Sequence, residues 1–143
     1  MKCEEVMTKK VVCCFPDDDV YKAANMMKQY DIGAIPVVDD DENRALMGII
    51  TDRDLAIRVV GVSGDTKTAK VTDVMTKKLV TCHGFDDVQK VLDLMADNQL
   101  RRIPVVDNDS RVIGIIAQAD IATRLNKPDK TAEVVKDISE SKI

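Results

Sequence analysis

The stretch Val6-Met7-Thr8-Lys9-Lys10 reveals how this sequence is organised, because it returns as Val74-Met75-Thr76-Lys77-Lys78. When the two copies are aligned at a shift of 68, residues 6–39 match residues 74–107 at 17 of 34 positions. Self-similarity of this kind marks a structural unit that is used more than once. The chain therefore predicts one unit of about 60 residues, present twice.

The repeat divides the chain into three parts. We place repeat 1 at residues 1–66, repeat 2 at residues 67–126 and a polar tail at residues 127–143. The tail is expected to fray, with at most a short helix, because chain ends are poorly ordered unless they are tied down. One repeat alone hides little surface, so the two copies are expected to form a pseudo-twofold pair.

Hydrophobic periodicity predicts an α/β unit with the order strand, helix, strand, strand, helix. In repeat 1 the strands are expected at residues 11–13, 35–38 and 46–51, with helices after Asp18-Asp19 and at residues 52–60. In repeat 2 the strands are expected at residues 79–81, 103–106 and 112–117, with helices after Asp86-Asp87 and at residues 118–125.

Composition narrows the class of protein. The chain has 143 residues, is 45% hydrophobic and 32% charged, and carries a formal charge of −4, which is typical of a globular domain. An acidic balance and few aromatic residues argue against nucleic-acid binding. No apolar run reaches the roughly 18–20 residues of a membrane-spanning helix. The first residues, MKCEEVMTKK, do not have the pattern of a signal peptide, so a cytoplasmic location is expected.

The cysteines and the single histidine give little sign of a metal site. Cys3, Cys13, Cys14 and Cys82 contain no C-x-x-C motif, and His83 is the only histidine. We expect reduced thiols that pack as small apolar groups, and no metal. Catalysis is not expected either, because the sequence contains no motif that pairs a nucleophile with a general base.

The most specific candidate for ligand chemistry is residues 48–54, GIITDRD, where a strand ends at the start of a helix. Asp54 could accept hydrogen bonds from two neighbouring ribose hydroxyls, and Thr51 could donate to a sugar or phosphate oxygen. The same Thr-x-x-Asp spacing is also an ordinary helix cap. In repeat 2 the threonine is replaced by Ala117 while Asp120 remains, so the acid is not there only to partner a threonine.

A pair of arginines distinguishes repeat 2 from repeat 1. Arg101-Arg102 precede the strand at residues 103–106, where repeat 1 has Gly33-Ala34. Guanidinium groups in an acidic protein suit a phosphate, which arginine binds with two parallel hydrogen bonds. A solvated pair bonded to nearby carboxylates is the alternative.

The twin VMTKK, the twin IPVVD strands and the pair GIITDRD and GIIAQAD together resemble a tandem cystathionine-beta-synthase (CBS) domain pair, the Bateman module. The resemblance covers residues 1 to about 126. It implies two units that pack through their sheets, with up to two clefts for adenine-containing ligands such as AMP, ADP, ATP or S-adenosylmethionine.

The resemblance also implies which residues line each cleft. The better site would use Ile49, Thr51, Arg53, Asp54, Thr76, Lys78, Leu100, Arg101 and Arg102. The weaker, pseudo-symmetric site would use Thr8, Lys10, Ile32, Ile115 and Asp120. In the better site Asp54 would hold ribose hydroxyls, Leu100 and Ile49 would enclose the adenine, and the arginines would face phosphates. In the weaker site Ala117 lacks the hydroxyl, which puts phosphate binding there in doubt.

Three classes of function remain open. The leading hypothesis is a non-catalytic sensor that binds an adenosyl ligand. The second is a dimerisation module with vestigial clefts, and the family resemblance also implies a homodimer. The third is a thiol or metal redox protein, suggested by Cys14 and Cys82 at equivalent repeat positions.

Overall fold

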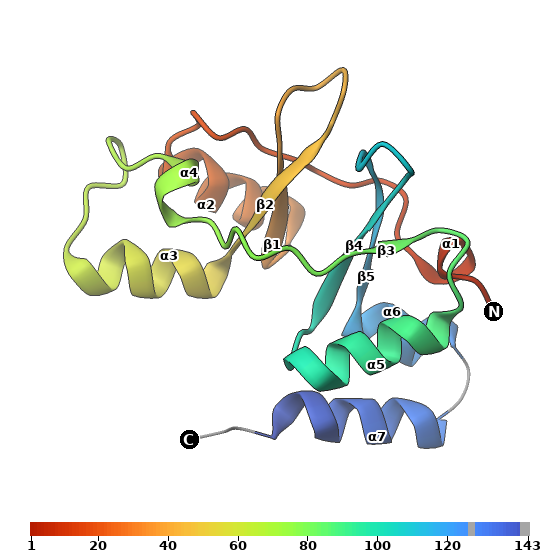
Figure 1. Cartoon of the computed structure of the whole chain (residues 1–143). Helices are drawn as coiled ribbons and strands as arrows, with labels where there is room; N and C mark the ends of the chain where they lie inside the picture. The colour runs from red at the N-terminus through yellow and green to blue at the C-terminus, as the bar shows by residue number, and fades with distance from the viewer. Residues whose placement is uncertain (126–127, 141–143) are drawn as a thin grey trace. The chain divides into compact units, whose positions relative to one another are not determined.

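The structure is a computed structural model that describes residues 1–125 and 128–140, and it divides into two compact units (Figure 1). Unit 1 consists of residues 1–10 and the chain from residue 80 onward, and unit 2 is Val11–Leu79. The boundaries of the units differ from the repeat boundaries that we place on the sequence. Residues 67–79, which open repeat 2, belong to unit 2, and residues 1–10, which open repeat 1, belong to unit 1.

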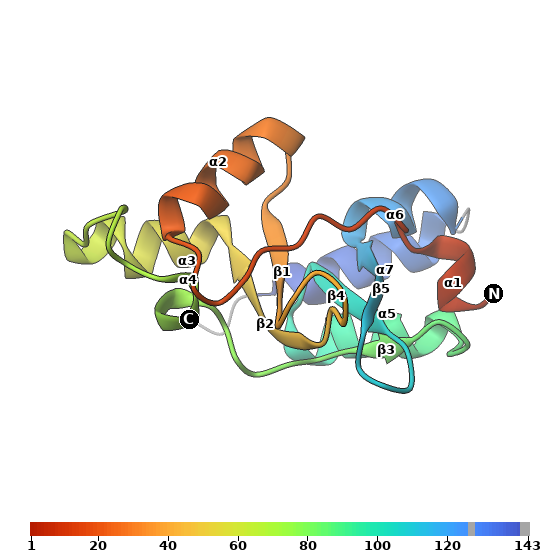
Figure 2. The same cartoon turned by 90° about the horizontal axis from the view of Figure 1, so that it is seen from above.

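Unit 2 is a two-stranded antiparallel sheet with helices (Figure 2). Its elements are α2 (Val20–Tyr30), β1 (Ala34–Val38), β2 (Leu46–Thr51), α3 (Asp52–Arg58), the 3-10 helix η1 (Val60–Val62) and α4 (Val71–Val74). The N-cap Asp19 accepts a hydrogen bond from the backbone of Lys22, at 2.8 Å, as the paired aspartates of the sequence predict. Val20, Ile35, Val37 and Ile50 form the centre of its core.

Among the described residues, unit 1 repeats this plan with one further strand and one further α-helix. Its elements are α1 (Cys3–Val6), β3 (Cys82–His83), α5 (Val88–Asn98), β4 (Arg102–Val106), β5 (Val112–Ala117), α6 (Gln118–Arg124) and α7 (Pro128–Ser139). The strand order is β3-β4-β5, with β3 parallel to β4 and β4 antiparallel to β5. The α/β class predicted from the sequence is therefore confirmed.

The predicted first strand of each repeat is wrong in its position. Residues 11–13 form no strand, and sheet pairing there is limited to a single parallel bridge between Cys14 and Val37. Residues 79–81 are likewise irregular, and β3 begins only at Cys82. The β-prone side chains lead the chain to the sheet, but only one or two residues reach hydrogen-bonding distance of the neighbouring strand.

The prediction of a frayed tail is also wrong. Helix α7 runs from Pro128 to Ser139 beside α5 (Figure 1). Val134 and Ile138, four residues apart, lie on one face of α7 and are buried in the core of unit 1. Burial of this apolar face ties the helix down, in spite of its polar composition.

Two glycines allow the segments that carry Thr76 and Thr8, here called the opening segments, to approach the sheets closely. A Cβ on Gly48 would lie 2.7 Å from Sδ of Met75 and 2.9 Å from the carbonyl oxygen of Thr76. A Cβ on Gly114 would lie 2.9 Å from Cγ of Met7 and 3.1 Å from the carbonyl oxygen of Thr8. In both units, glycine therefore sets how closely the segment that carries the threonine approaches the sheet.

Candidate functional site

The site in unit 2 begins where β2 passes into α3. Thr51 is the N-cap, and its Oγ1 accepts a hydrogen bond from the backbone N–H of Asp54 at 3.1 Å. The backbone N–H of Thr51 donates in return to Oδ2 of Asp54 at 3.0 Å. The capping interpretation of this pair is therefore correct, and it fixes the Asp54 carboxylate in a buried position.

A third residue shows that Asp54 does more than cap its helix. Thr76 comes from the segment after α4, forms a bridge with Ile49 of β2, and places its hydroxyl 3.4 Å from both carboxylate oxygens of Asp54. The two backbone hydrogen bonds between Ile49 and Thr76, at 2.8 and 3.0 Å, hold this geometry. The hydroxyl and the carboxylate thus come from segments more than twenty positions apart in the sequence.

Unit 1 contains the same arrangement with one group missing. The hydroxyl of Thr8 donates to Oδ1 of Asp120 at 3.1 Å, and Thr8 forms a bridge with Ile115 of β5. Oδ2 of Asp120 accepts from the backbone N–H of Ala117 at 2.8 Å. Ala117 has no hydroxyl, so the Asp120 backbone lacks the side-chain acceptor that Thr51 provides in unit 2.

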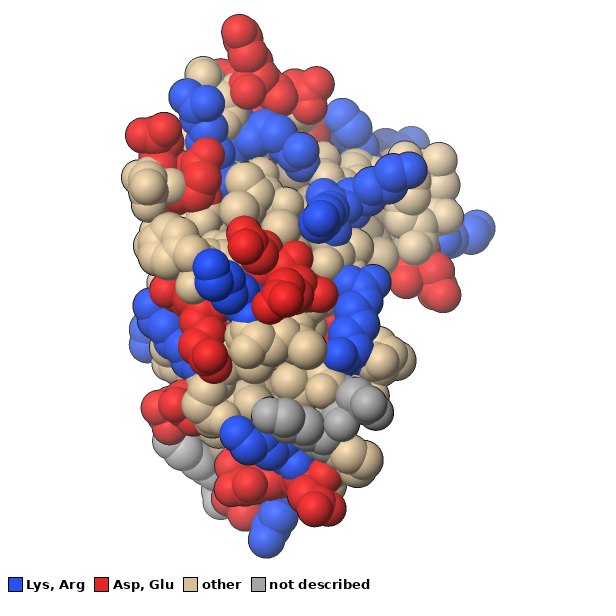
Figure 3. All heavy atoms as spheres, turned by 90° about the vertical axis from the view of Figure 1, so that its right-hand side faces the viewer, with Lys and Arg blue, Asp and Glu red and all other residues tan. Residues whose placement is uncertain are grey.

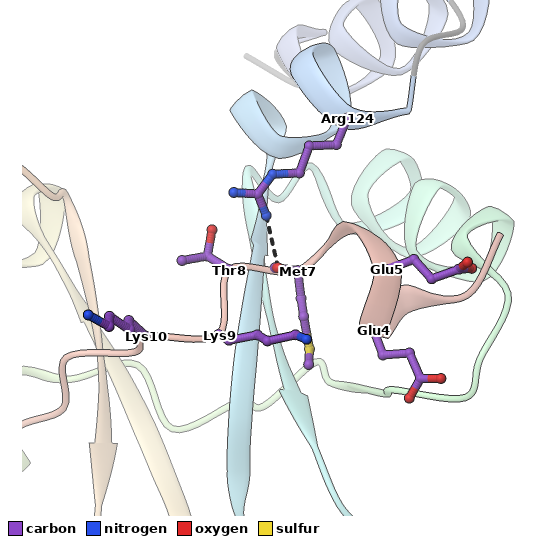
Figure 4. A pocket seen from close by; sticks show the side chains of 7 residues that line it. All are labelled: Glu4, Glu5, Met7, Thr8, Lys9, Lys10 and Arg124. Atoms are coloured by element: carbon purple, nitrogen blue, oxygen red, sulfur yellow. Dashed lines mark hydrogen bonds between the residues drawn. The ribbon is translucent and has the colours of Figure 1, made fainter.

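An arginine completes each site, and the sequence prediction does not include either one. Nε of Arg58 lies 3.9 Å from Oδ1 of Asp54, and Nη1 of Arg124 lies 3.7 Å from Oδ1 of Asp120. Nη1 of Arg124 also donates to the carbonyl oxygens of Val6 and Met7, both at 2.9 Å. Figure 4 shows the bond to Met7. The repeat could have identified these two arginines, because Arg58 and Arg124 match at the shift of 66 that also aligns Asp54 with Asp120.

A hollow near these groups lies in unit 1, beside Thr8. It has a volume of about 830 Å³ and is open to solvent. Its lining comes from α1, the segment after it and α6, as Figure 4 shows, and consists of Glu4, Glu5, Met7, Thr8, Lys9, Lys10 and Arg124. Two predicted residues of the weaker site, Thr8 and Lys10, therefore border a space that could admit a small molecule.

The two predicted arginines lie in unit 1. Arg101 and Arg102 line a second hollow of about 340 Å³ with Ala117, Gln118, Ala119 and Ala122. The backbone N–H of Gln118, the first residue of α6, donates to the carbonyl oxygen of Arg101 at 2.8 Å. The structure thus brings these arginines to the helix that carries Asp120.

The other predicted residues also divide between the units. Unit 2 holds six members of the predicted better site, namely Ile49, Thr51, Arg53, Asp54, Thr76 and Lys78, whereas Leu100, Arg101 and Arg102 belong to unit 1. Arg53 and Lys78 are exposed, Ile49 is half-buried, and Leu100 packs against the core of unit 1. Four members of the weaker site lie in unit 1, and the fifth, Ile32, packs against the core of unit 2.

Other kinds of site find little support in the described residues. Within residues 1–125 and 128–140, no group of three or more His, Cys, Asp and Glu side chains is arranged to hold a metal ion. Among the helices described there, none has the length and apolar character needed to cross a membrane. Figure 3 shows a face on which acidic and basic side chains are interspersed.

The thiols that suggested redox chemistry are separated between the units. Cys14 belongs to unit 2 and Cys82 to unit 1. Burial raises the pKa of the Cys14 thiol to about 12, so it stays protonated at neutral pH. Cys82 is buried in unit 1, where its thiol donates to the carbonyl oxygen of Pro104 at 4.0 Å.

Comparison with known proteins identifies the repeat. A family model for the CBS domain matches residues 3–61 and again residues 71–127. The chain is 40% identical to uncharacterized protein YlbB of Bacillus subtilis over 139 residues, which are 97% of this chain and 92% of that protein.

Two crystal structures are similar over most of the chain. Hypoxic Response Protein I of Mycobacterium tuberculosis, crystallised with two coordinated zinc ions, has a TM-score of 0.76 at 31% identity, over 85% of this chain and 97% of that one. The CBS domain pair of protein MJ0100, in complex with 5'-methylthioadenosine and S-adenosyl-L-methionine, has a TM-score of 0.73 at 27% identity, over 85% of this chain and 93% of that one.

Proposed function

Because the chain belongs to the CBS domain family, we propose that it is a non-catalytic regulatory module that binds an adenosyl ligand at the Asp54 and Asp120 sites. The ligand class comprises AMP, ADP, ATP and S-adenosylmethionine. The proposed location is the cytoplasm, where thiols such as the four free cysteines remain reduced.

The observation that carries this proposal is the Thr–Asp–Arg arrangement, present once in each unit. Thr76 and Arg58 flank the buried carboxylate of Asp54, and Thr8 and Arg124 flank that of Asp120. A carboxylate accepts hydrogen bonds through two oxygens, so it can hold both hydroxyls of a ribose. A helix cap alone needs neither the threonine from a distant segment nor the arginine.

The ligand class has independent support from a relative. The CBS pair of MJ0100 was crystallised with two ligands that share an adenosine group, and the similarity covers nearly all of that pair. The adenosine is therefore the part of the ligand that we assign to the Asp54 and Asp120 sites. The groups attached to its 5' carbon would differ between ligands.

The two sites differ in the groups available to a phosphate. Arg101 and Arg102 lie beside the start of α6, so a phosphate is assigned to the Asp120 side of unit 1. In unit 2 the equivalent positions are Gly33 and Ala34, and the hydroxyl of Thr51 is occupied as a cap. We therefore assign an uncharged adenosyl group, or a weaker ligand, to the Asp54 side.

Thermal denaturation tests the proposal directly. The intact protein is titrated with AMP, ATP and S-adenosylmethionine, and a ligand at 100 times its dissociation constant should stabilise the fold by about 2.7 kcal/mol. Asp120→Asn keeps the size of the side chain but removes its charge, and should abolish the shift produced by AMP while Asp54→Asn preserves it. The absence of a shift with every adenosyl compound would contradict the proposal.

A second candidate function is a homodimerisation module with vestigial sites. Large apolar side chains are exposed on unit 2, including Tyr21, Ile57, Val60 and Val62, with exposed fractions of 56%, 51%, 72% and 67%. These side chains favour contact with another molecule. Under this alternative Asp54→Asn and Asp120→Asn leave the protein's assembly unchanged and no adenosyl compound binds. Light scattering that gives a mass near the 15.8 kDa of one chain would count against a dimer.

A further inference from the structure

In unit 1 the thioether of Met7 lies where a side chain at position 114 would otherwise stand. A Cβ on Gly114 would have Sδ of Met7 as its nearest neighbour, with Cγ of the same side chain at 2.9 Å. Unit 2 repeats this contact between Met75 and Gly48. The sulfur of Met7 therefore packs directly against the backbone of β5, and the pairing of a methionine with a glycine is a feature of the repeat.

Hydrogen bonds hold the backbone on either side of this contact. Nη1 of Arg124 donates to the carbonyl oxygen of Met7 at 2.9 Å. The next residue, Thr8, exchanges two backbone hydrogen bonds with Ile115, at 2.9 and 3.0 Å, and its hydroxyl donates to Asp120 at 3.1 Å. The contact of Met7 with β5 thus belongs to the packing that keeps Thr8 beside Asp120.

The sulfur borders solvent, although little of Met7 is exposed. Its exposed fraction is 9%, whereas that of Met95, in the same core, is 0%. The Met7 side chain lines the open hollow of about 830 Å³ together with Glu4 and Lys9, as Figure 4 shows. Hydrogen peroxide is only slightly larger than water and fits easily into a space of this size. It therefore has a path to the sulfur that does not require unit 1 to unfold.

We propose that Met7 is a modification site, at which a hydroperoxide such as hydrogen peroxide oxidises the thioether to a sulfoxide. The sulfur attacks one peroxide oxygen, so that an S–O bond forms and the O–O bond breaks. The proton on the attacked oxygen passes to the departing oxygen, which leaves as water, or as an alcohol when an alkyl hydroperoxide reacts. The sulfur loses two electrons and the peroxide gains them.

Oxidation loosens the segment that carries Thr8 because a sulfoxide is polar and a thioether is not. The neighbours of Met7 in the core of unit 1 are apolar, and a polar oxygen buried among them without a partner is costly. We expect the oxidised side chain to turn out toward the hollow and leave Gly114, which weakens the hold of β5 on Thr8. A methionine sulfoxide reductase reverses the reaction, so the modification acts as a switch.

Peptide mass spectrometry of the intact protein after treatment with hydrogen peroxide tests the site. Trypsin places Met7 in the peptide 3–9 and Met47, whose exposed fraction is 43%, in the peptide 45–53. Both peptides should gain one oxygen atom while the protein is folded, and fragment spectra should place the first of these on Met7 and not on Cys3. The melting temperature should fall by roughly 3–6 °C, with faster hydrogen exchange around Thr8. Treatment with a methionine sulfoxide reductase should restore both.

Two variants separate Met7 from the other methionines. Met7→Leu keeps the size of the side chain and removes the sulfur, so its melting temperature should not respond to peroxide. Met47→Leu, the control at an exposed position, should respond like the wild type. An unmodified Met7 in protein whose Met47 is fully oxidised would overturn the proposal. So would a sulfoxide at Met7 without a fall in melting temperature, or an equal fall in Met7→Leu.

Discussion

The close approach of Thr76 to β2 depends on the absence of a side chain at Gly48, so Gly48→Ala is a sensitive test of the unit 2 site. The new Cβ would lie 2.7 Å from Sδ of Met75 and 2.9 Å from the carbonyl oxygen of Thr76. The methionine can move, but the carbonyl oxygen is held by the Ile49 N–H at 3.0 Å. The segment around Thr76 must therefore shift outward.

The free energy of this change follows from two opposing effects. Overpacking a well-filled site costs about 1–3 kcal/mol. Replacing glycine by alanine restricts the unfolded chain and returns about 0.4–1 kcal/mol, since Gly48 has no positive φ. The net expectation is a destabilisation of about 1–2 kcal/mol, which in a chain of this size lowers the melting temperature by roughly 3–6 °C.

Urea denaturation followed by circular dichroism measures the change, with Gly84→Ala as the matched control. A Cβ on Gly84 would have its nearest neighbour at 3.4 Å, the Oε2 atom of Glu4, which is ordinary contact with a flexible side chain. This control should stay within about 0.5 kcal/mol of the wild type. If Gly48→Ala were as stable as Gly84→Ala, the opening segment would not be held against β2 as the structure describes.

Three further changes test other parts of the structure. Ile138→Ala should destabilise unit 1 by about 2–5 kcal/mol, as expected when a large side chain is removed from a core. The backbone amides of α5 should then exchange hydrogen faster, while those of α2 are unaffected. Arg124→Gln removes the guanidinium that donates to two carbonyl oxygens and faces Asp120, so it should lower the free energy of unfolding by about 1–3 kcal/mol. Arg53 is exposed, so Arg53→Gln should leave the free energy of unfolding unchanged and serves as the control in urea denaturation. The backbone N–H of His83 donates to the Asp86 carboxylate and lowers its pKa below the ordinary value of an aspartate. Asp86 therefore stabilises the fold above that ordinary value and loses this contribution as the pH falls through the lowered pKa. Asp86→Asn should flatten the dependence of stability on pH below about 4, and an unchanged slope would refute the assignment.

Much of the fold could be predicted because the repeat is explicit. The alignment of IPVVD with IPVVD places β1 and β4, and the alignment of Gly48 with Gly114 places β2 and β5. The start of α2 follows from an aspartate whose side chain caps a helix in the structure. These features are local in sequence, so propensity and periodicity suffice to find them.

The parts that were missed depend on contacts between distant segments. Helix α7 is polar on average, and its stability comes from Val134 and Ile138 in a core formed by other elements. The first strand expected in each repeat is reduced to one bridge at Cys14 and to the two residues of β3, which no local pattern reveals.

The offset between repeats and units has a consequence for the site itself. A boundary between residues 66 and 67 follows the sequence repeat, yet it separates Thr76 from Asp54, which the structure joins in unit 2. Thr8 likewise lies at the start of repeat 1 but contacts Asp120 at the end of repeat 2. Each site therefore takes its carboxylate from one repeat and its hydroxyl from the opening segment of the other. In each case the threonine comes within a few residues of the point where the chain passes from one unit to the other.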